Sequence, residues 1–203
     1  MLRVAVDGVD GAGKTMFADE LAAALAERDV EVVRASVDGF HQARDVRHLR
    51  GRTSPEGFFQ DSYDYARLKS ELLDPLGPDG DRRIRLAVYD VSREQPVHHA
   101  ELAVAPGAVL VLDGIFLHRP ELRGYWDLSV FLDVDFAVSV ARMAVRDGAP
   151  ADPDHPANAR YVDGQRLYLA ECAPREAADV VVDNNDLDHP VVRRRAAAQR
   201  RNG

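Results

Sequence analysis

Short apolar runs alternate with longer amphipathic segments along the chain. Residues 2–6 (LRVAV) form an apolar run that ends at an Asp-Gly pair, and Phe17, Leu21 and Leu25 then recur at every fourth position. A spacing of four places side chains on one face of a helix, whereas a short apolar run bounded by turn residues is typical of a buried strand. The N-terminal segment therefore predicts a strand, a glycine-rich loop and an amphipathic helix.

The same alternation continues toward the C-terminus. Further strands are predicted at 31–37, 109–112, 128–132 and 180–182, and helices at 64–73 and 136–145. Segments 84–89 and 102–104 are weaker strand candidates that could pair as a hairpin at one edge. Strands that alternate with helices in this way indicate an α/β fold around a parallel sheet.

The chain reads as one domain over residues 1–190. Its 203 residues contain no repeat and no linker that would divide it. Residues 147–158, rich in Pro, Asp and Ala, follow a predicted helix and indicate a mobile loop, so we place a small lid at about 147–160. Residues 191–203 carry five arginines and are expected to form a disordered basic tail.

Composition narrows the classes of protein. Hydrophobic residues make up 46% and charged residues 30% of the chain, as in folded soluble proteins. The single cysteine, Cys172, forms no internal disulfide, and with no apparent secretory signal or membrane-length apolar run this indicates a cytoplasmic protein. The net charge of −8 argues against a nucleic-acid partner. A homo-oligomer remains open.

The sequence GVDGAGKT at positions 8–15 fits the phosphate-binding pattern G-x-x-x-x-G-K-[ST]. Glycines let successive backbone N–H groups point at phosphate oxygens, and the following helix adds its positive end. Lys14 would reach the β and γ phosphates, and the Thr15 hydroxyl is a hard oxygen ligand for Mg²⁺. The motif predicts ATP and Mg²⁺ as cofactors. The residues expected to bind the nucleotide are Gly8, Asp10, Gly11, Ala12, Gly13, Lys14 and Thr15.

Two aspartates stand at the ends of predicted parallel strands, where α/β sheets bind ligands. Asp113 follows the apolar run 109–112, beside the phosphate loop, and is a candidate Mg²⁺ ligand, directly or through water. Asp38 follows the run 31–37 and could accept the proton of an attacking hydroxyl. Since Asp-Gly occurs seven times in the chain, a plain turn is the alternative for both.

Phosphoryl transfer also requires positive charge around the leaving group. Arg142 and Arg146 lie four residues apart, hence on one helix face beside the predicted lid. We expect both to stabilise the transferring group, and closure of the lid to exclude water. A solvated helix face is the alternative.

Taken together, these motifs resemble the uridine kinase and phosphoribulokinase group of P-loop kinases, which also includes bacterial pantothenate kinases. The matching segments are GVDGAGKT, SVDGF (36–40), SPEGFFQDSYDYARL (54–68), VYD (88–90), VLDGIF (111–116) and ADVVVDN (178–184). The resemblance implies a P-loop NTPase three-layer sandwich with a parallel central sheet and a small lid. It also implies that Asp38 is the catalytic base, that Asp113 replaces a usual glutamate, and that Arg160 is a further lid arginine beside Arg142 and Arg146.

The acceptor is the open part of this interpretation. The resemblance favours the primary hydroxyl of uridine or cytidine, with Asp38, His41, Tyr65, Tyr89, Asp90 and Arg160 as the residues expected around the acceptor. Similar uridine kinases carry a histidine shortly after the Tyr-Asp pair, where this chain has Val-Ser-Arg-Glu. Segment 41–52 holds four arginines and one aspartate, which would suit pantothenate or another anionic acceptor or be solvated. A regulatory P-loop protein without an acceptor is a third possibility.

Overall fold

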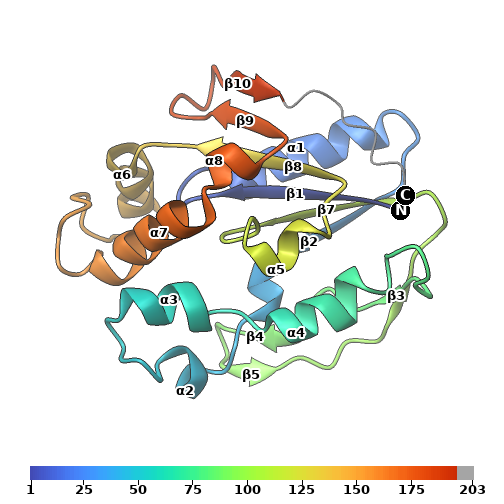
Figure 1. Ribbon diagram of the computed structural model, residues 1–203, viewed down its shortest axis with the longest axis horizontal. Coiled ribbons are helices and arrows are strands. Elements are labelled where there is room, and N and C mark those ends of the chain that lie inside the picture. The colour runs from blue at the N-terminus through green and yellow to red at the C-terminus, as the bar shows by residue number, and fades with distance from the viewer. Residues whose placement is uncertain (196–203) are drawn as a thin grey trace.

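A six-stranded sheet forms the centre of the protein. The structure, a computed structural model, describes residues 1–195, and within them the strand order is β10-β9-β8-β1-β7-β2 (Figure 1). The strands are β1 (Leu2–Gly8), β2 (Val32–Ser36), β7 (Val109–Gly114), β8 (Leu128–Asp133), β9 (Val180–Asp183) and β10 (Val191–Arg195). All neighbours pair in parallel except β10 with β9. The predicted parallel α/β sheet is thus confirmed.

Side chains that alternate along the strands pack against two separate layers of helices, one on each face of the sheet. Val4 and Val6 pack in one apolar cluster with α1 (Lys14–Ala26) and α6 (Phe136–Asp147), whereas Ala5, between them, packs in the other. This period of two is that of a pleated strand buried on both faces. The second cluster is covered by α3 (Pro55–Asp61), α4 (Tyr65–Leu68), α5 (Pro120–Arg123) and α7 (Ala159–Cys172). The result is the predicted three-layer sandwich.

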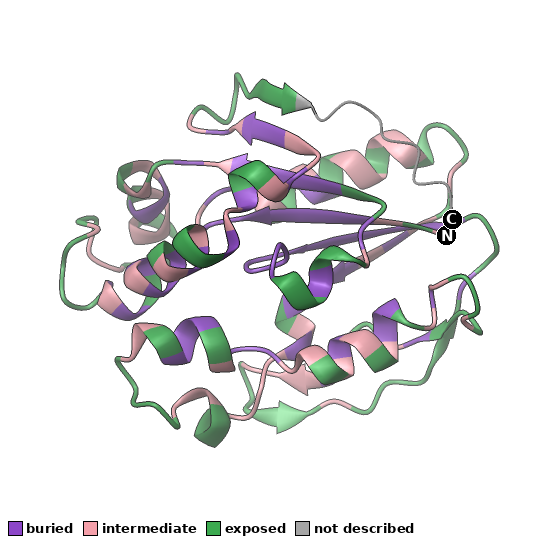
Figure 2. Cartoon of the chain, viewed as in Figure 1, coloured by how far each residue is buried: buried purple, intermediate pink, exposed green. Residues whose placement is uncertain are grey.

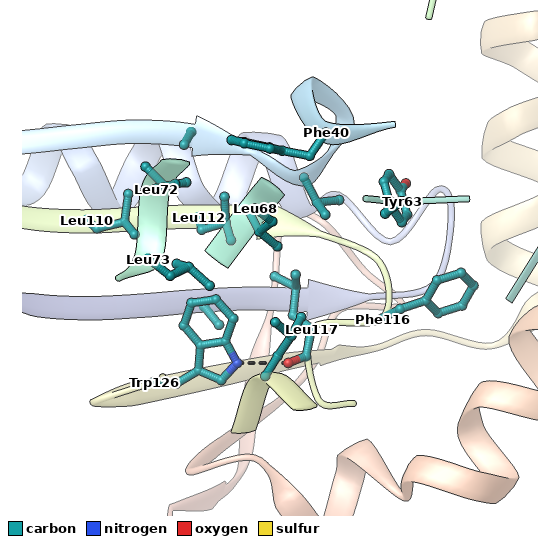
Figure 3. Close-up of a cluster of buried hydrophobic side chains, with 14 of the residues drawn as sticks. Phe40, Tyr63, Leu68, Leu72, Leu73, Leu110, Leu112, Phe116, Leu117 and Trp126 are labelled. Atoms are coloured by element: carbon teal, nitrogen blue, oxygen red, sulfur yellow. Dashed lines mark hydrogen bonds between the residues drawn. The ribbon is translucent and has the colours of Figure 1, made fainter. Parts of the chain in front are cut away.

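The predicted helix at 64–73 is present as α4 followed by a π-helical turn, η2 (Lys69–Leu73). Asp64 caps it, because its side chain accepts a hydrogen bond from the Arg67 N–H at 2.9 Å. Its leucines lie in the same cluster as Leu110 and Leu112 of β7 (Figure 3). Trp126 belongs to the same cluster and donates its indole N–H to the Leu117 carbonyl at 2.8 Å.

Smaller elements surround the sheet. They are η1 (Val37–Phe40), α2 (Arg44–Arg47), α8 (Pro174–Ala177), β3 (Arg83–Ile84), β4 (Tyr89–Asp90), β5 (Gln95–Pro96) and β6 (Leu102–Ala103). The expected hairpin is present only between β3 and β6, because β4 pairs with β5 in a second antiparallel ribbon. Neither ribbon joins the central sheet.

The start of the expected disordered tail is a strand, so that prediction was wrong for residues 191–195. Val191 and Val192 are β-branched, which favours extended backbone, and Arg193 pairs with Asp183 of β9 at 2.6 Å. Arg194 donates to three backbone carbonyls around α8. The strand lies at the exposed edge of the sheet, in contrast to the buried β1 and β7 (Figure 2). Residues 196–203 lie outside the described part of the chain.

None of the helices in residues 1–195 combines the length and apolar character that a bilayer crossing requires.

Candidate active site

The loop at 8–15 connects β1 to α1 at the carboxyl end of the sheet. Gly11 and Gly13 have φ values of +73° and +87°, a conformation that favours glycine. A Cβ on Gly11 would lie 2.3 Å from the Ser139 carbonyl oxygen, so no larger residue fits there. The loop opens onto a cavity of about 400 Å³, here called the donor cavity. It is lined by Asp10, Gly11, Gly13, Lys14, Thr15, Met16, Asp38, Tyr63, Asp113, Gly114, Ile115, Arg142, Met143, Arg146 and Leu187.

The shape of the loop is held by side chains from outside it. Asn184, after β9, donates to the Ala12 carbonyl at 2.8 Å, and Gln165 of α7 accepts a hydrogen bond from the Asp10 N–H at 2.5 Å. Burial raises the pKa of the Asp10 carboxyl above its usual range, which the charge of Lys14 partly opposes. The Lys14 ammonium donates to the Val9 carbonyl at 2.8 Å. The loop is therefore fixed in the shape that binds phosphates.

A buried polar cluster supports the loop from below. Asp7, fully buried at the end of β1, accepts hydrogen bonds from the Gly8 N–H at 2.7 Å and from the Tyr168 hydroxyl. The His118 ring lies 2.7 Å from the same carboxylate through Nδ1. The cluster could not be predicted from the sequence, because Asp7 is in one Asp-Gly pair among seven and its partners are distant in the chain.

Thr15 and Asp113 meet in the donor cavity as expected. The Thr15 hydroxyl lies 2.8 Å from Asp113 Oδ2, and Arg34 of β2 donates to Oδ1 at 3.1 Å. Two hard oxygens side by side fit Mg²⁺, which commonly takes one or two protein oxygens and completes its shell with phosphates and water. Arg34, which the sequence analysis missed, holds the carboxylate so that Oδ2 faces Thr15.

Asp38 lies in η1, directly after β2, with its carboxylate in the donor cavity. The Tyr63 hydroxyl donates to Asp38 Oδ1 at 2.9 Å. Burial, and then the Asp38 charge, raise the pKa of Tyr63 well above its ordinary value, so this hydroxyl remains a donor. His41 bonds through Nδ1 to the Asp38 carbonyl at 2.8 Å and packs on the Tyr63 ring. The pairing could not be predicted from the sequence, because Tyr63 lies 25 residues from Asp38.

The two arginines of α6 differ in their contacts. The Arg142 guanidinium donates to the carbonyls of Asn184 at 3.0 Å and Asn185 at 2.8 Å, with a longer contact of 3.3 Å to Gly11. Arg146 lines the same cavity, is 67% exposed and, within residues 1–195, pairs only with its neighbour Asp147 at 2.7 Å. Arg142 is thus part of the wall of the loop, and Arg146 is the more available cation.

Of the six residues expected near the acceptor, Asp38 alone lines the donor cavity, and three of the others form contacts within the fold. Arg160 is buried on α7 and donates to the carbonyls of Arg47, Gly51 and Ser54, so it secures a loop. Asp90 accepts from Ser92, which holds a turn and lowers the Asp90 pKa. Tyr65 packs beneath the Arg119 guanidinium, 4.8 Å from the ring centroid.

A second, more open cavity of about 560 Å³ lies beside α2 and is here called the α2 cavity. It contains Tyr89, whose hydroxyl donates to Glu94 at 3.1 Å. Its lining residues are Ala43, Arg44, Asp45, His48, Arg52, Tyr89 and Glu94. Of the expected acceptor residues, Asp38 therefore lines the donor cavity and Tyr89 lines the α2 cavity. His41 lines neither cavity and contacts Asp38.

Helix α7 links both regions. Arg160 near its start holds the loop after α2, Gln165 holds the phosphate loop, and Tyr168 reaches Asp7 below that loop. The helix crosses one face of the sheet next to α3 (Figure 1). No prediction placed a helix here.

Comparisons with known proteins point to one family. The model of the phosphoribulokinase / uridine kinase family matches residues 4–151. A uridine kinase of Alkaliphilus metalliredigens is 25% identical over 145 residues, which are 71% of this chain and 67% of that relative. Alignments with three such curated relatives span 65% to 67% of the relatives' length.

Solved structures show the same fold. A candidate uridine kinase from Bacillus stearothermophilus superposes with a TM-score of 0.69 at 22% identity, covering 89% of this chain and 87% of that one. A candidate fructose transport system kinase from Silicibacter sp. TM1040 superposes with a TM-score of 0.61 at 27% identity, covering 80% and 84%. The two cavities thus lie in a sandwich that kinases of this kind share.

Proposed function

The chain belongs to the phosphoribulokinase / uridine kinase family, and on that premise we propose that it transfers the γ-phosphoryl group of ATP to a primary hydroxyl of a small metabolite. The observation that carries the proposal is the position of Asp38. Its carboxylate shares one cavity with the phosphate loop and with the Thr15–Asp113 pair, so a hydroxyl bound against Asp38 faces the end of a nucleotide held by the loop.

In the proposed reaction, the acceptor oxygen forms a bond to the γ-phosphorus as the bond from that phosphorus to the β–γ bridging oxygen breaks. ADP leaves, and the hydroxyl proton passes to the Asp38 carboxylate. Tyr63 holds that carboxylate by its 2.9 Å hydrogen bond. Lys14 and the loop amides bind the phosphates, and Arg146 supplies positive charge at the leaving group. Mg²⁺, when bound by Thr15 and Asp113, would compensate the charge of the phosphates.

Two acceptor classes fit the proposal. A nucleoside, uridine or cytidine, is supported by the likeness to curated uridine kinases. An anionic metabolite is the second candidate, because arginines line the α2 cavity. In either case the proposed activity is that of a small-molecule kinase.

Replacement of Asp38 tests the proposal. Asp38→Asn keeps the shape of the side chain and removes the base, so we expect turnover to fall by roughly 10²–10⁴ while nucleotide affinity stays unchanged. Asp79→Asn, in an exposed Asp-Gly turn, is the matched control and should behave as wild type. The measurement is ADP release over a panel of nucleosides, pantothenate and sugar phosphates, together with calorimetric binding of ADP. Full turnover by Asp38→Asn would remove Asp38 from the mechanism, and ATP hydrolysis that no acceptor stimulates would favour a regulatory protein.

A further inference from the structure

The segment 41–52 contributes four arginines, and the structure divides them into two pairs. Arg47 forms an ion pair with Glu94, and Arg50 pairs with Asp61 at 2.8 Å. Arg44 and Arg52 both line the α2 cavity, and neither side chain has a hydrogen bond or ion pair among the described residues. Two of the four cations are thus neutralised within the fold, and the other two face the cavity unpaired.

The two acids of the same cavity are already engaged. Glu94 accepts from the Tyr89 hydroxyl and from Arg47, and these contacts lower the Glu94 pKa. Asp45 accepts a hydrogen bond from the Val46 N–H at 3.0 Å. An exposed arginine is ordinarily solvated, but two that line one cavity and form no ion pair among residues 1–195 offer positive charge and N–H donors to an anion.

His48 also lines this cavity, and its pKa reflects both its loss of solvent and the positive charge around it. Its Nδ1 is buried without a hydrogen-bond partner, and its pKa is lowered, first by loss of solvent and then by repulsion from four arginines that include Arg44 and Arg52. A neutral imidazole has one nitrogen that can accept and one that can donate. It can therefore bond a ligand oxygen here without adding charge.

The α2 cavity also lies close to Asp38. The Val88 N–H donates to the Gly39 carbonyl at 2.8 Å, which ties the residue before Tyr89 to the residue after Asp38. Adding standard backbone lengths to that contact puts the α-carbons of Asp38 and Tyr89 within roughly 14 Å of each other. Asp38 and the α2 cavity thus flank the same short piece of backbone, which is the arrangement that a shared acceptor requires.

We infer that the α2 cavity binds an anionic group of the acceptor, a carboxylate or a phosphate ester, through Arg44 and Arg52. That the bound molecule is a phosphoryl acceptor rests on the proposed kinase function. Binding of an anion at the α2 cavity does not depend on turnover. The acceptor is then an anionic alcohol: its charged end is held at α2, and its free hydroxyl reaches the Asp38 carboxylate.

Two experiments test the inference separately from the kinase proposal. In the first, the phosphate loop is filled with a non-hydrolysable ATP analogue and Mg²⁺, and inorganic phosphate is titrated by calorimetry and thermal shift. Wild type and Arg28→Gln, an exposed arginine in the turn after α1, should bind phosphate, and Arg44→Gln/Arg52→Gln should not. Equal binding by the double variant would overturn the inference.

In the second experiment, ADP release is compared for matched acceptors: glycerate with glycerol, pantothenate with its alcohol, and ribose 5-phosphate with ribose. Wild type should prefer the anionic member of any pair it accepts, and each single arginine variant should raise the acceptor KM about tenfold, the loss of one charge-assisted hydrogen bond, with kcat retained. Preference for the neutral member overturns the inference and leaves the kinase standing. Turnover absent for every acceptor, with phosphate binding still lost in the double variant, refutes the kinase proposal and leaves the anion site standing.

Discussion

Replacing Arg142 separates a role in holding the phosphate loop from a role in charge stabilisation. Its guanidinium donates to the carbonyls of Asn184 at 3.0 Å and Asn185 at 2.8 Å. Its contact to the Gly11 carbonyl, 3.3 Å, is longer than an ordinary N–H···O bond. Arg142→Gln leaves those carbonyls without their donor. A hydrogen bond from a charged donor contributes about 1.5–3 kcal/mol. The side chain is half-buried, so water replaces part of the loss, and we take about 2 kcal/mol for the pair.

For a chain of this length, 2 kcal/mol corresponds to a fall in Tm of roughly 4–8 °C. Because the lost bonds hold the rim of the phosphate loop, the same variant should also bind ADP more weakly. Arg146→Gln is the matched control: among the described residues Arg146 pairs only with the adjacent Asp147, it is 67% exposed, and such surface pairs contribute about 0–1 kcal/mol. Its Tm should stay near that of wild type while kcat falls.

The assay is differential scanning calorimetry of both variants, with ADP titration and steady-state kinetics at saturating acceptor. If Arg142→Gln kept the wild-type Tm and ADP affinity and lost only kcat, the positioning role would be refuted, and Arg142 would be a charge stabiliser of the transferring group, as the sequence suggested.

Two further results are expected. Tyr63→Phe removes the hydrogen bond that holds Asp38. Because such a bond to a charged group contributes at least roughly 1.5 kcal/mol, kcat should fall about tenfold while ADP affinity stays unchanged. Tyr161→Phe, on an exposed ring, is the control, and an unchanged kcat in Tyr63→Phe would contradict the assignment. Asp10→Asn should raise Tm at pH 7, because the folded pKa of Asp10 lies above its unfolded value near 3.8 and stability is lost as pH rises through that window. The gain should vanish well below pH 3.8, where both states carry the proton, and a gain that is independent of pH would exclude the Asp10 charge as its source.

The parts of the site that the sequence predicted are those encoded locally. The phosphate loop and the strand-end positions of Asp38 and Asp113 follow from short apolar runs and their terminating turns, and in a parallel sheet those ends meet at one edge. Their chemical partners could not be predicted in this way. Tyr63 is 25 residues from Asp38, and Gln165 is 155 residues from Asp10, so only the folded packing brings them together.

Helix α7 escaped prediction for a different reason. Its buried side includes Arg160, Gly164 and Gln165, so the apolar periodicity that reveals an amphipathic helix is weak. Polar side chains are buried there because each has backbone or side-chain partners elsewhere in the fold. The opposite error occurred at residues 191–195, where a run of arginines indicated a tail although each described guanidinium found an acceptor in the neighbouring elements.

The contacts of α7 have a consequence for the spacing of the two cavities. Arg160 and Gln165 are five positions apart on one helix, roughly 7.5 Å along its axis, and they hold the α2 loop and the phosphate loop respectively. A single inserted residue between them would rotate one anchor by about 100° relative to the other. The spacing between the donor cavity and the α2 cavity is therefore set by a helix that lines neither of them, and a change in the length of α7 would alter that spacing without touching either lining.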